Sequence, residues 1–190
     1  PGPARKAFDR ALALDPKLVA ALAGRGRTQY RQGRSAAALR DFDAALALDP
    51  RSVAALYNRA ELNFDAERYD KALADLDAAA AIDAEDVDVL YLRSRVFLAQ
   101  GCRDRALRDL EEVLRLDPAD ADALIQEGYI YNDLGDALAA RDALDAGLKL
   151  RPDIAVAWLW RSQARAELGD APGAARDRAQ ALKLDPKVER

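Results

Sequence analysis

Residues 19–52 read VAALAGRGRTQYRQGRSAAALRDFDAALALDPRS, and this stretch decides the fold. Apolar residues recur in it at helical spacing, a glycine stands near its middle at Gly33, and Asp49 and Pro50 come near its end. Glycine tolerates the left-handed backbone angles that end many helices, and proline cannot continue the helical hydrogen-bond ladder. The stretch therefore predicts two helices, separated by a turn at Gly33 and ended by Pro50.

Proline recurs at this position every 34 residues along the chain, and Ala84 stands at the one position where the proline is missing. The prolines in this register are Pro16, Pro50, Pro118, Pro152 and Pro186. A fixed period of this length is typical of a solenoid of stacked repeats. It predicts five full repeats after a half-repeat in residues 1–18. The full repeats are 19–52, 53–86, 87–120, 121–154 and 155–188.

Small and large apolar residues occupy fixed columns within the repeats. The second helix of every repeat has alanine at one position: Ala4, Ala38, Ala72, Ala106, Ala140 and Ala174. Four residues later the side chain is large and apolar in all but the last repeat: Phe8, Phe42, Leu76, Leu110 and Leu144. Small residues let two helix backbones approach closely, and large residues fill the space toward the next repeat. One repeat cannot bury its apolar face alone, so the repeats must stack.

Composition and charge exclude several classes of protein. The chain has 190 residues, of which 51% are hydrophobic and 33% charged, with a net charge of −4. This mixture does not fit a disordered chain. No basic stripe favours nucleic acid, and no apolar run reaches the length of a membrane span. A single cysteine, Cys102, allows no internal disulfide and favours a reducing compartment, so we expect a cytoplasmic protein.

Arginine and aspartate recur sixteen residues apart in four of the five repeats. The fourth repeat has Glu127 and Ala143 at these positions, so both partners are lost together. Antiparallel helices joined by a short turn would bring the two positions to one level, which predicts bidentate ion pairs between the helices. The alternative is that these arginines reach a ligand's carboxylate. The predicted pairs are Arg25 with Asp41, Arg59 with Asp75, Arg93 with Asp109, and Arg161 with Asp177.

Taken together, the columns resemble the tetratricopeptide repeat (TPR) family. Repeat 19–52 fits the family pattern with Leu22, Gly26, Tyr30, Ala38, Phe42, Ala45 and Pro50, where Tyr30 stands one place beyond the usual aromatic. The resemblance implies an all-α fold of about eleven helices, arranged as a right-handed superhelix. It also implies a concave groove lined mainly by the first helix of each repeat.

The resemblance places a peptide-binding groove on first-helix columns that are rich in aromatic and charged side chains. Tyrosine offers a large contact area at a low cost in conformational entropy. The expected groove residues are Arg27, Tyr30, Arg31, Tyr57, Asn58, Glu61, Phe64, Tyr91, Arg95, Gln126, Tyr129 and Asn132. Basic residues lie toward the N-terminal half and acidic residues toward the C-terminal half. The alternative is a solvated groove whose tyrosines only support packing.

The sequence lacks the residue types that most catalytic sites use. The chain has no histidine, which removes the commonest general base and metal ligand, and Cys102 has no histidine to activate it. We therefore expect no enzyme, no cofactor and no metal site. The leading hypothesis is a scaffold that binds a protein or peptide, without nucleic acid or membrane insertion. The alternatives are a self-associating structural scaffold and the regulatory TPR region of a larger enzyme.

The two ends of the array differ in polarity. Arg178 replaces the large residue of the last second helix, which indicates a cap-like polar face on repeat 155–188 and a natural end near residue 188. Residues 1–18 carry Phe8, Leu12 and Leu14 without a preceding first helix, which suggests that a preceding segment has been cut away. We expect fraying or self-association to concentrate at this N-terminal end.

Overall fold

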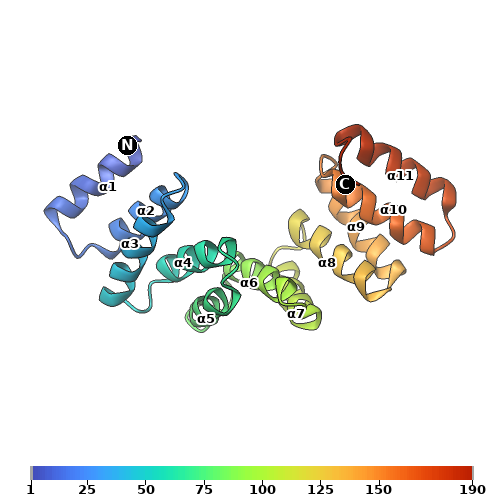
Figure 1. The fold of residues 1–190 in the computed structure, drawn as a ribbon. Helices are drawn as coiled ribbons and strands as arrows, with labels where there is room; N and C mark the ends of the chain where they lie inside the picture. Colours follow the sequence, from blue (N-terminus) through green and yellow to red (C-terminus); the bar gives the residue numbers. More distant parts are fainter. Residues whose placement is uncertain (1, 190) are drawn as a thin grey trace. The chain divides into compact units, whose positions relative to one another are not determined.

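The computed structural model describes residues 2–189, and these residues form eleven α-helices and no strand (Figure 1). The helices are α1 (Pro3–Leu14), α2 (Val19–Tyr30), α3 (Ser35–Leu48), α4 (Val53–Asp65), α5 (Tyr69–Ala80), α6 (Val87–Ala99), α7 (Arg103–Leu116), α8 (Ala121–Leu134), α9 (Ala137–Leu150), α10 (Ala155–Glu167) and α11 (Ala171–Leu184). The all-α fold expected from the sequence is confirmed. The helices α2, α4, α6, α8 and α10 begin 34 residues apart, and we keep the five repeats above as the proposed division of the chain.

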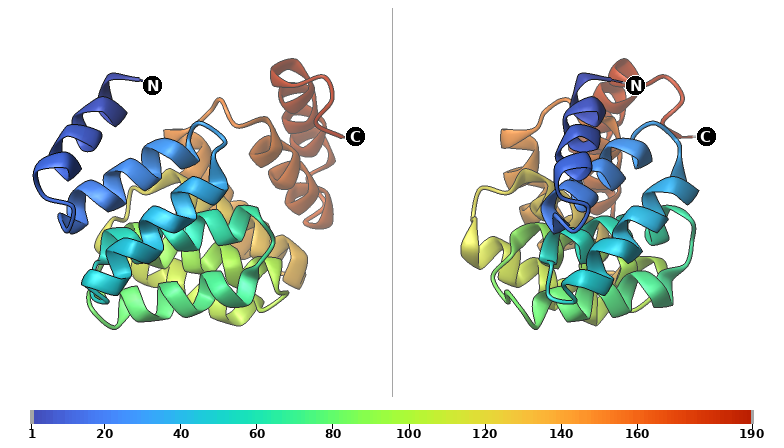
Figure 2. Two further views of the ribbon diagram at one scale, coloured as in Figure 1. Left: turned by 60° about the vertical axis from the view of Figure 1, so that its left-hand side comes forward. Right: turned by 90° about the vertical axis from the view of Figure 1, so that its left-hand side faces the viewer.

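The chain divides into two compact units, Pro1–Cys102 and Arg103–Arg190. In the first unit α2 packs against α3, α4 against α5, and α5 against α6, while α1 packs against α2 (Figure 2). In the second unit α8 packs against α9 and α10 against α11, and α10 also contacts α8 and α9. The pairing of α6 with α7 would join the two units, and it stays a prediction.

Each turn inside a repeat uses a residue with a positive φ. Gly33, Gly101, Gly135 and Gly169 have φ between 73° and 82°, and Glu67 takes the same place with a φ of 55°. After α2, the Gly33 amide donates to the Tyr30 carbonyl (2.8 Å) and the Arg34 amide to the Gln29 carbonyl (3.0 Å). These bonds satisfy carbonyls that the helix leaves open at its end. The recurring glycine is therefore required by the backbone of the turn.

An aspartate precedes the proline position in all but one repeat, including Asp83 before Ala84, and it makes a local turn at the end of the second helix. In each case its carboxylate accepts a hydrogen bond from the backbone amide two residues later, at 2.9–3.1 Å. The residues that do this are Asp15, Asp49, Asp83, Asp117 and Asp185. Such side-chain turns compete with helix continuation and stabilise the corner. At the exception, Arg151, the guanidinium instead pairs with Asp153 at 3.0 Å.

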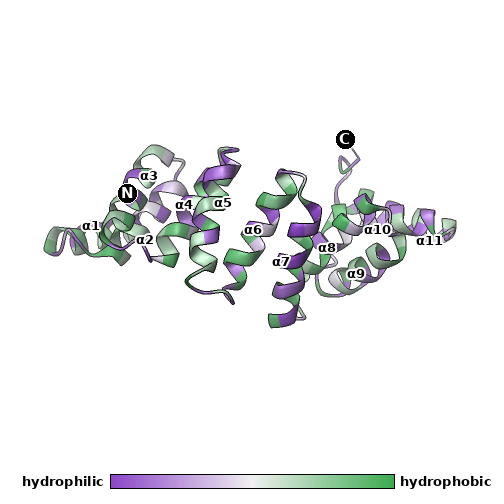
Figure 3. Ribbon diagram, turned by 90° about the horizontal axis from the view of Figure 1, so that it is seen from below, coloured by the Kyte–Doolittle hydropathy of each residue, from purple (hydrophilic) through white to green (hydrophobic). Residues whose placement is uncertain are grey.

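The small-residue columns mark the places where two helices approach most closely. A Cβ built on Gly26 would lie 2.5 Å from the Phe42 ring, and one on Gly128 would lie 2.5 Å from Leu144. Phe42 and Leu144 are completely buried. Ala38 and Ala72, from the alanine column of the second helices, are completely buried as well. Each helix accordingly carries both hydrophobic and hydrophilic residues (Figure 3). A methyl group added at either glycine would force the paired helices apart.

In the region that the structure describes, no helix combines the length and the apolar character that crossing a membrane requires.

Candidate peptide-binding surface and the ion pairs beneath it

The arginines of the first helices make bidentate pairs with the second helix of their own repeat. Arg59 donates from Nε to Asp75 Oδ2 (2.9 Å) and from Nη2 to Asp75 Oδ1 (2.7 Å). Arg25 bonds Asp41 in the same way at 2.8 and 2.7 Å, and Arg161 bonds Asp177 at 2.8 and 2.8 Å. The structure thus brings together three of the four predicted pairs.

Each of these arginines also reaches a second aspartate, which the sequence reasoning missed. Nη1 of Arg59 donates to Asp43 (2.7 Å), Nη1 of Arg161 to Asp145 (2.7 Å), and Nη1 of Arg25 to Asp9 (3.3 Å). The second aspartate lies sixteen residues before the arginine, just as the first lies sixteen residues after it. This symmetric spacing was the signal that could have found it. One guanidinium therefore links three helices.

These internal bonds bear on whether the arginines pair helices or reach a ligand's carboxylate. Hydrogen bonds to Asp75 are the first cause that raises the pKa of Arg59, and hydrogen bonds to Asp41 do the same for Arg25. All three guanidinium nitrogens of each side chain are engaged inside the fold. These bonds favour the structural interpretation, in which the arginines hold neighbouring helices together.

The pair Arg93–Asp109 joins residues of different units and stays a prediction. Arg93 does donate to Asp77, sixteen residues before it, at 3.1 Å.

The fourth repeat replaces the arginine by Glu127. This carboxyl group is half-buried, and burial followed by repulsion from Glu111 raises its pKa, while a hydrogen bond from Tyr131 lowers it. Glu111 occupies the position sixteen residues before Glu127, where the other repeats have aspartate. Two carboxylates therefore stand where the other repeats join an arginine to an aspartate.

In the first unit, the expected groove residues gather on neighbouring faces of α2, α4 and α6, which contact one another in sequence. We call them the groove surface: Arg27, Tyr30, Arg31, Tyr57, Glu61, Phe64, Tyr91 and Arg95. The aromatic side chains and Glu61 are half-buried, and the three arginines are exposed. The surface thus has a partly apolar floor with cations at its edges.

Three contacts tie adjacent helices together at the groove surface. The Tyr30 hydroxyl on α2 donates to the carboxylate of Asp65 on α4. The Phe64 ring packs at 5.9 Å from the Tyr69 ring, and the Arg95 guanidinium of α6 lies over Phe64 at 4.6 Å. A cation over an aromatic face is attracted by the ring quadrupole. These contacts hold the aromatic floor in one arrangement.

Electrostatics show that the charged groups of this surface act on one another. Burial raises the pKa of the Tyr57 hydroxyl to about 12, and Glu61 and Asp88 add to the effect. Burial also raises the pKa of Glu61, as does Asp65, whereas Arg27, Arg95 and Arg31 lower it. Tyr57 therefore stays protonated at neutral pH and keeps its hydroxyl as a hydrogen-bond donor.

The three arginines of the groove surface make no direct bond to a carboxylate, although all three act on Glu61 and lower its pKa. Among the residues that the structure describes, none of Arg27, Arg31 and Arg95 donates a hydrogen bond or forms an ion pair. This contrasts with the arginines beneath the surface, which are saturated by aspartates. The groove surface therefore offers free guanidinium donors next to aromatic rings.

Two amides expected in the groove are buried, which corrects the sequence-based prediction. Asn58 is 6% exposed and donates to the Ala54 carbonyl of its own helix. Asn132 is 7% exposed and donates to the Trp160 carbonyl of α10 at 2.8 Å. The Oδ1 atom of each is buried without a partner. Because both side chains are buried and donate to backbone carbonyls of the fold, we leave them out of the groove surface.

The remaining predicted residues, Gln126 and Tyr129, lie on α8 in the second unit and are half-buried. The Tyr129 ring packs against the Trp160 ring, with centroids 4.7 Å apart. They form a separate aromatic surface of that unit, and we describe no site that combines the two units.

In the described part of the chain, no group of three or more His, Cys, Asp or Glu side chains is arranged to hold a metal ion.

Comparison with solved structures shows helical-repeat relatives of low sequence identity. A structure of Pseudomonas aeruginosa PilF is 22% identical with a TM-score of 0.86, covering 94% of this chain and 82% of that chain. YrrB, described as a TPR protein with an unusual peptide-binding site, is 21% identical with a TM-score of 0.80, covering 96% and 94%. MamA is 20% identical with a TM-score of 0.78, covering 89% and 92%. Identities this low show the fold alone.

No curated protein sequence matches the chain. A family profile described as tetratricopeptide repeat matches residues 3–39, 23–87, 91–153 and 125–189, which together span nearly the whole chain. With the helix pairs, the glycine turns and the 34-residue spacing of the first helices, this match shows that the chain belongs to the tetratricopeptide repeat family.

Proposed function

We propose that this protein is a scaffold that binds a peptide or protein segment on the groove surface of α2, α4 and α6. The observation that carries the proposal is the set of three unpaired arginines beside half-buried aromatic rings. Unpaired guanidinium groups are strong donors to carboxylates, and tyrosine supplies contact area at low entropic cost. The surface is therefore suited to a segment that carries acidic side chains near apolar ones.

The similarity to YrrB supports a peptide as the class of ligand, because that protein is described as having a peptide-binding site. The role is binding without catalysis. The groove surface presents arginines, rings and a carboxylate that the arginines surround, and no nucleophile paired with a base accompanies them.

A selection experiment tests the proposed function. We expect peptides selected from a random display library to be enriched in Asp and Glu. Arg95→Gln and Tyr57→Ala should each lower the affinity for the selected peptides by about tenfold, because each removes one charge-assisted hydrogen bond or one aromatic contact. Isothermal titration calorimetry measures the affinities.

Arg40→Gln is the matched control, because Arg40 is exposed on α3, outside the groove surface. It should leave the affinity unchanged. Selection of basic peptides, or equal affinity for the Arg95 and Arg40 variants, would reject the groove surface as the binding site.

Self-association is a second candidate function, and one observation favours it. Leu14, at the end of α1, is 90% exposed, while the neighbouring Leu12 is buried. An exposed large apolar side chain beside a helix that packs mainly against one neighbour is a place where a second copy could dock.

A further inference from the structure

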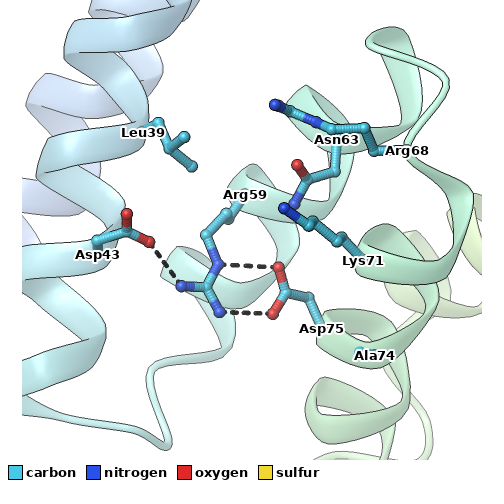
Figure 4. Close-up of a pocket in the computed structure, with 8 residues that line it drawn as sticks. All are labelled: Leu39, Asp43, Arg59, Asn63, Arg68, Lys71, Ala74 and Asp75. Atoms are coloured by element: carbon cyan, nitrogen blue, oxygen red, sulfur yellow. Dashed lines mark hydrogen bonds and ion pairs between the residues drawn. The ribbon is translucent and has the colours of Figure 1, made fainter.

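A cavity of about 340 Å³ lies between α3, α4 and α5 in the first unit (Figure 4). Its polar lining consists of two carboxylates, three cations and one amide. These are Asp43, Asp75, Arg59, Arg68, Lys71 and Asn63. Figure 4 shows Lys71 on α5 and Arg68 in the turn that precedes it, with the Asn63 amide from α4 beside them.

The cavity is separate from the groove surface. Asn63 follows Glu61 by two residues, and two residues turn an α-helix by about 200°. Arg59 is related to Tyr57 in the same way. The cavity therefore lies on the side of α4 opposite to the groove surface, and the inference does not depend on the proposed function.

Both carboxylates of the cavity accept hydrogen bonds from Arg59. Asp75 accepts two hydrogen bonds from Arg59, at 2.9 and 2.7 Å, and Asp43 accepts one at 2.7 Å. All three guanidinium nitrogens of Arg59 donate to these two carboxylates. This part of the cavity is a closed network.

The other three polar side chains have no such partners. Asn63 is only 4% exposed, yet its side-chain amide makes no hydrogen bond among the described residues. The Nε atom of Arg68 is buried without a partner. Lys71 makes no hydrogen bond or ion pair within residues 2–189. A buried donor without an acceptor is costly. Arg68 Nε is such a donor, and it lines the same cavity as the unbonded amide of Asn63 and the exposed, unpaired ammonium group of Lys71, which indicates an acceptor that belongs there.

The combination occurs in this repeat alone. In the preceding repeat, Gln29 takes the place of Asn63 and donates to Asp41, and Ala37 takes the place of Lys71. The later repeats have Phe97, Tyr131 and Arg165 at the asparagine position. The general architecture of the repeat therefore does not require these three donors.

We propose that Asn63, Arg68 and Lys71 bind a phosphate-type oxyanion, either free or carried on a phosphorylated side chain. The two cations without partners match the charge of about −1.5 to −2 that a phosphate monoester carries near neutral pH. Arginine and an amide supply directional N–H donors, and lysine supplies a charge on a flexible stem. Acidic neighbours at the α4–α5 turn do not fill the site. Asp70 accepts from Gln100 Nε2 at 2.9 Å, and Glu67 is exposed in the turn.

The test is a titration of the whole chain with inorganic phosphate, with phosphoserine and with acetate, followed by NMR. We expect saturable binding of inorganic phosphate, with the largest shifts at the Asn63 side-chain amide and at the start of α5. Stronger binding of phosphoserine would identify a phosphorylated side chain as the source, and equal binding would identify free phosphate. Lys71→Gln and Arg68→Gln should each weaken binding by about tenfold.

Arg34→Gln is the matched control, because Arg34 precedes α3 as Arg68 precedes α5 and is exposed. It should bind phosphate like the parent chain, and so should the groove variant Tyr57→Ala. Lys71 is exposed, so Lys71→Gln decides the question even if Arg68→Gln fails to fold. Non-saturable shifts, equal loss in the Arg34 variant, or acetate binding as tight as phosphate would overturn the proposal.

Discussion

At the scale of single residues, Glu67 is the one turn residue whose backbone conformation its side chain disfavours. It has a φ of 55° where the four equivalent turns have glycine. A left-handed conformation costs an L-residue about 1–2 kcal/mol, and glycine avoids this cost. Glycine also makes the unfolded chain more flexible, which lowers the free energy of unfolding by about 0.4–1 kcal/mol. Glu67→Gly should therefore stabilise the fold by about 0.5–1 kcal/mol, measured by urea denaturation.

Glu67→Ala is the control for the charge, because it removes the carboxylate and keeps the Cβ. It should give no comparable gain. If the alanine variant gains as much as the glycine variant, electrostatic repulsion at the turn is the cause and backbone strain is not.

The sequence predicts these turns well but predicts exposure poorly. A positive φ is a local demand of the backbone, so recurring glycines mark it directly. Whether Asn58 lies in the groove depends on how far neighbouring helices cover its side of α4, and a column of one repeat cannot show this. The second partner of Arg59, Asp43, belongs to the preceding repeat, so the spacing within one repeat did not reveal it.

At the scale of helices, the fourth repeat lacks the guanidinium that elsewhere links three helices. The double variant Glu127→Arg with Ala143→Asp would restore it, since Glu111 already stands where the other repeats have the upstream aspartate. We expect the double variant to be more stable than the parent by about 1 kcal/mol, the upper range for a partly exposed pair. Thermal or urea unfolding measures this free energy.

The single variants provide the comparison for this restored pair. Ala143→Asp alone should destabilise, because it adds a third carboxylate near Glu111 and Glu127. A double-mutant cycle should show favourable coupling between the two substitutions. Absence of coupling would contradict a linking role for the guanidinium.

The pH dependence of the same site has a definite sign. Burial and Glu111 raise the pKa of Glu127, so the folded state binds this proton more tightly than the unfolded state. The contribution of Glu127 to stability is therefore largest at low pH and is lost as the pH rises through its raised pKa. The advantage of the double variant over the parent should accordingly be larger at pH 7 than at pH 4.

Helix positions could be predicted from the sequence because glycine, proline and aspartate act locally at most corners. The oxyanion cavity could not, because Asn63, Arg68 and Lys71 come from two helices and a turn. Their convergence depends on which rotamers remain free once Asp43 and Asp75 bind Arg59. Such a site is visible only when the saturated and the unsaturated donors can be told apart.

At the scale of the whole molecule, stability in a repeat array depends on how many neighbours each helix has. In the first unit α4 contacts α2, α3, α5 and α6, whereas α1 packs mainly against α2. The α1–α2 contact is close, since a Cβ on Gly24 would lie 2.5 Å from the Phe8 ring, but it covers one side of α1 only. Local opening should therefore require less free energy in α1 than in α4.

Hydrogen exchange at two protein concentrations tests this and the second candidate function together. In dilute solution the amides of α1 should exchange faster than those of α4. If a second copy docks beside the exposed Leu14, protection of α1 should rise with protein concentration, and Leu14→Glu should abolish the rise. Exchange of α1 that does not depend on concentration would remove self-association through α1. Protection of α1 equal to that of α4 in dilute solution would contradict the link between neighbours and local stability.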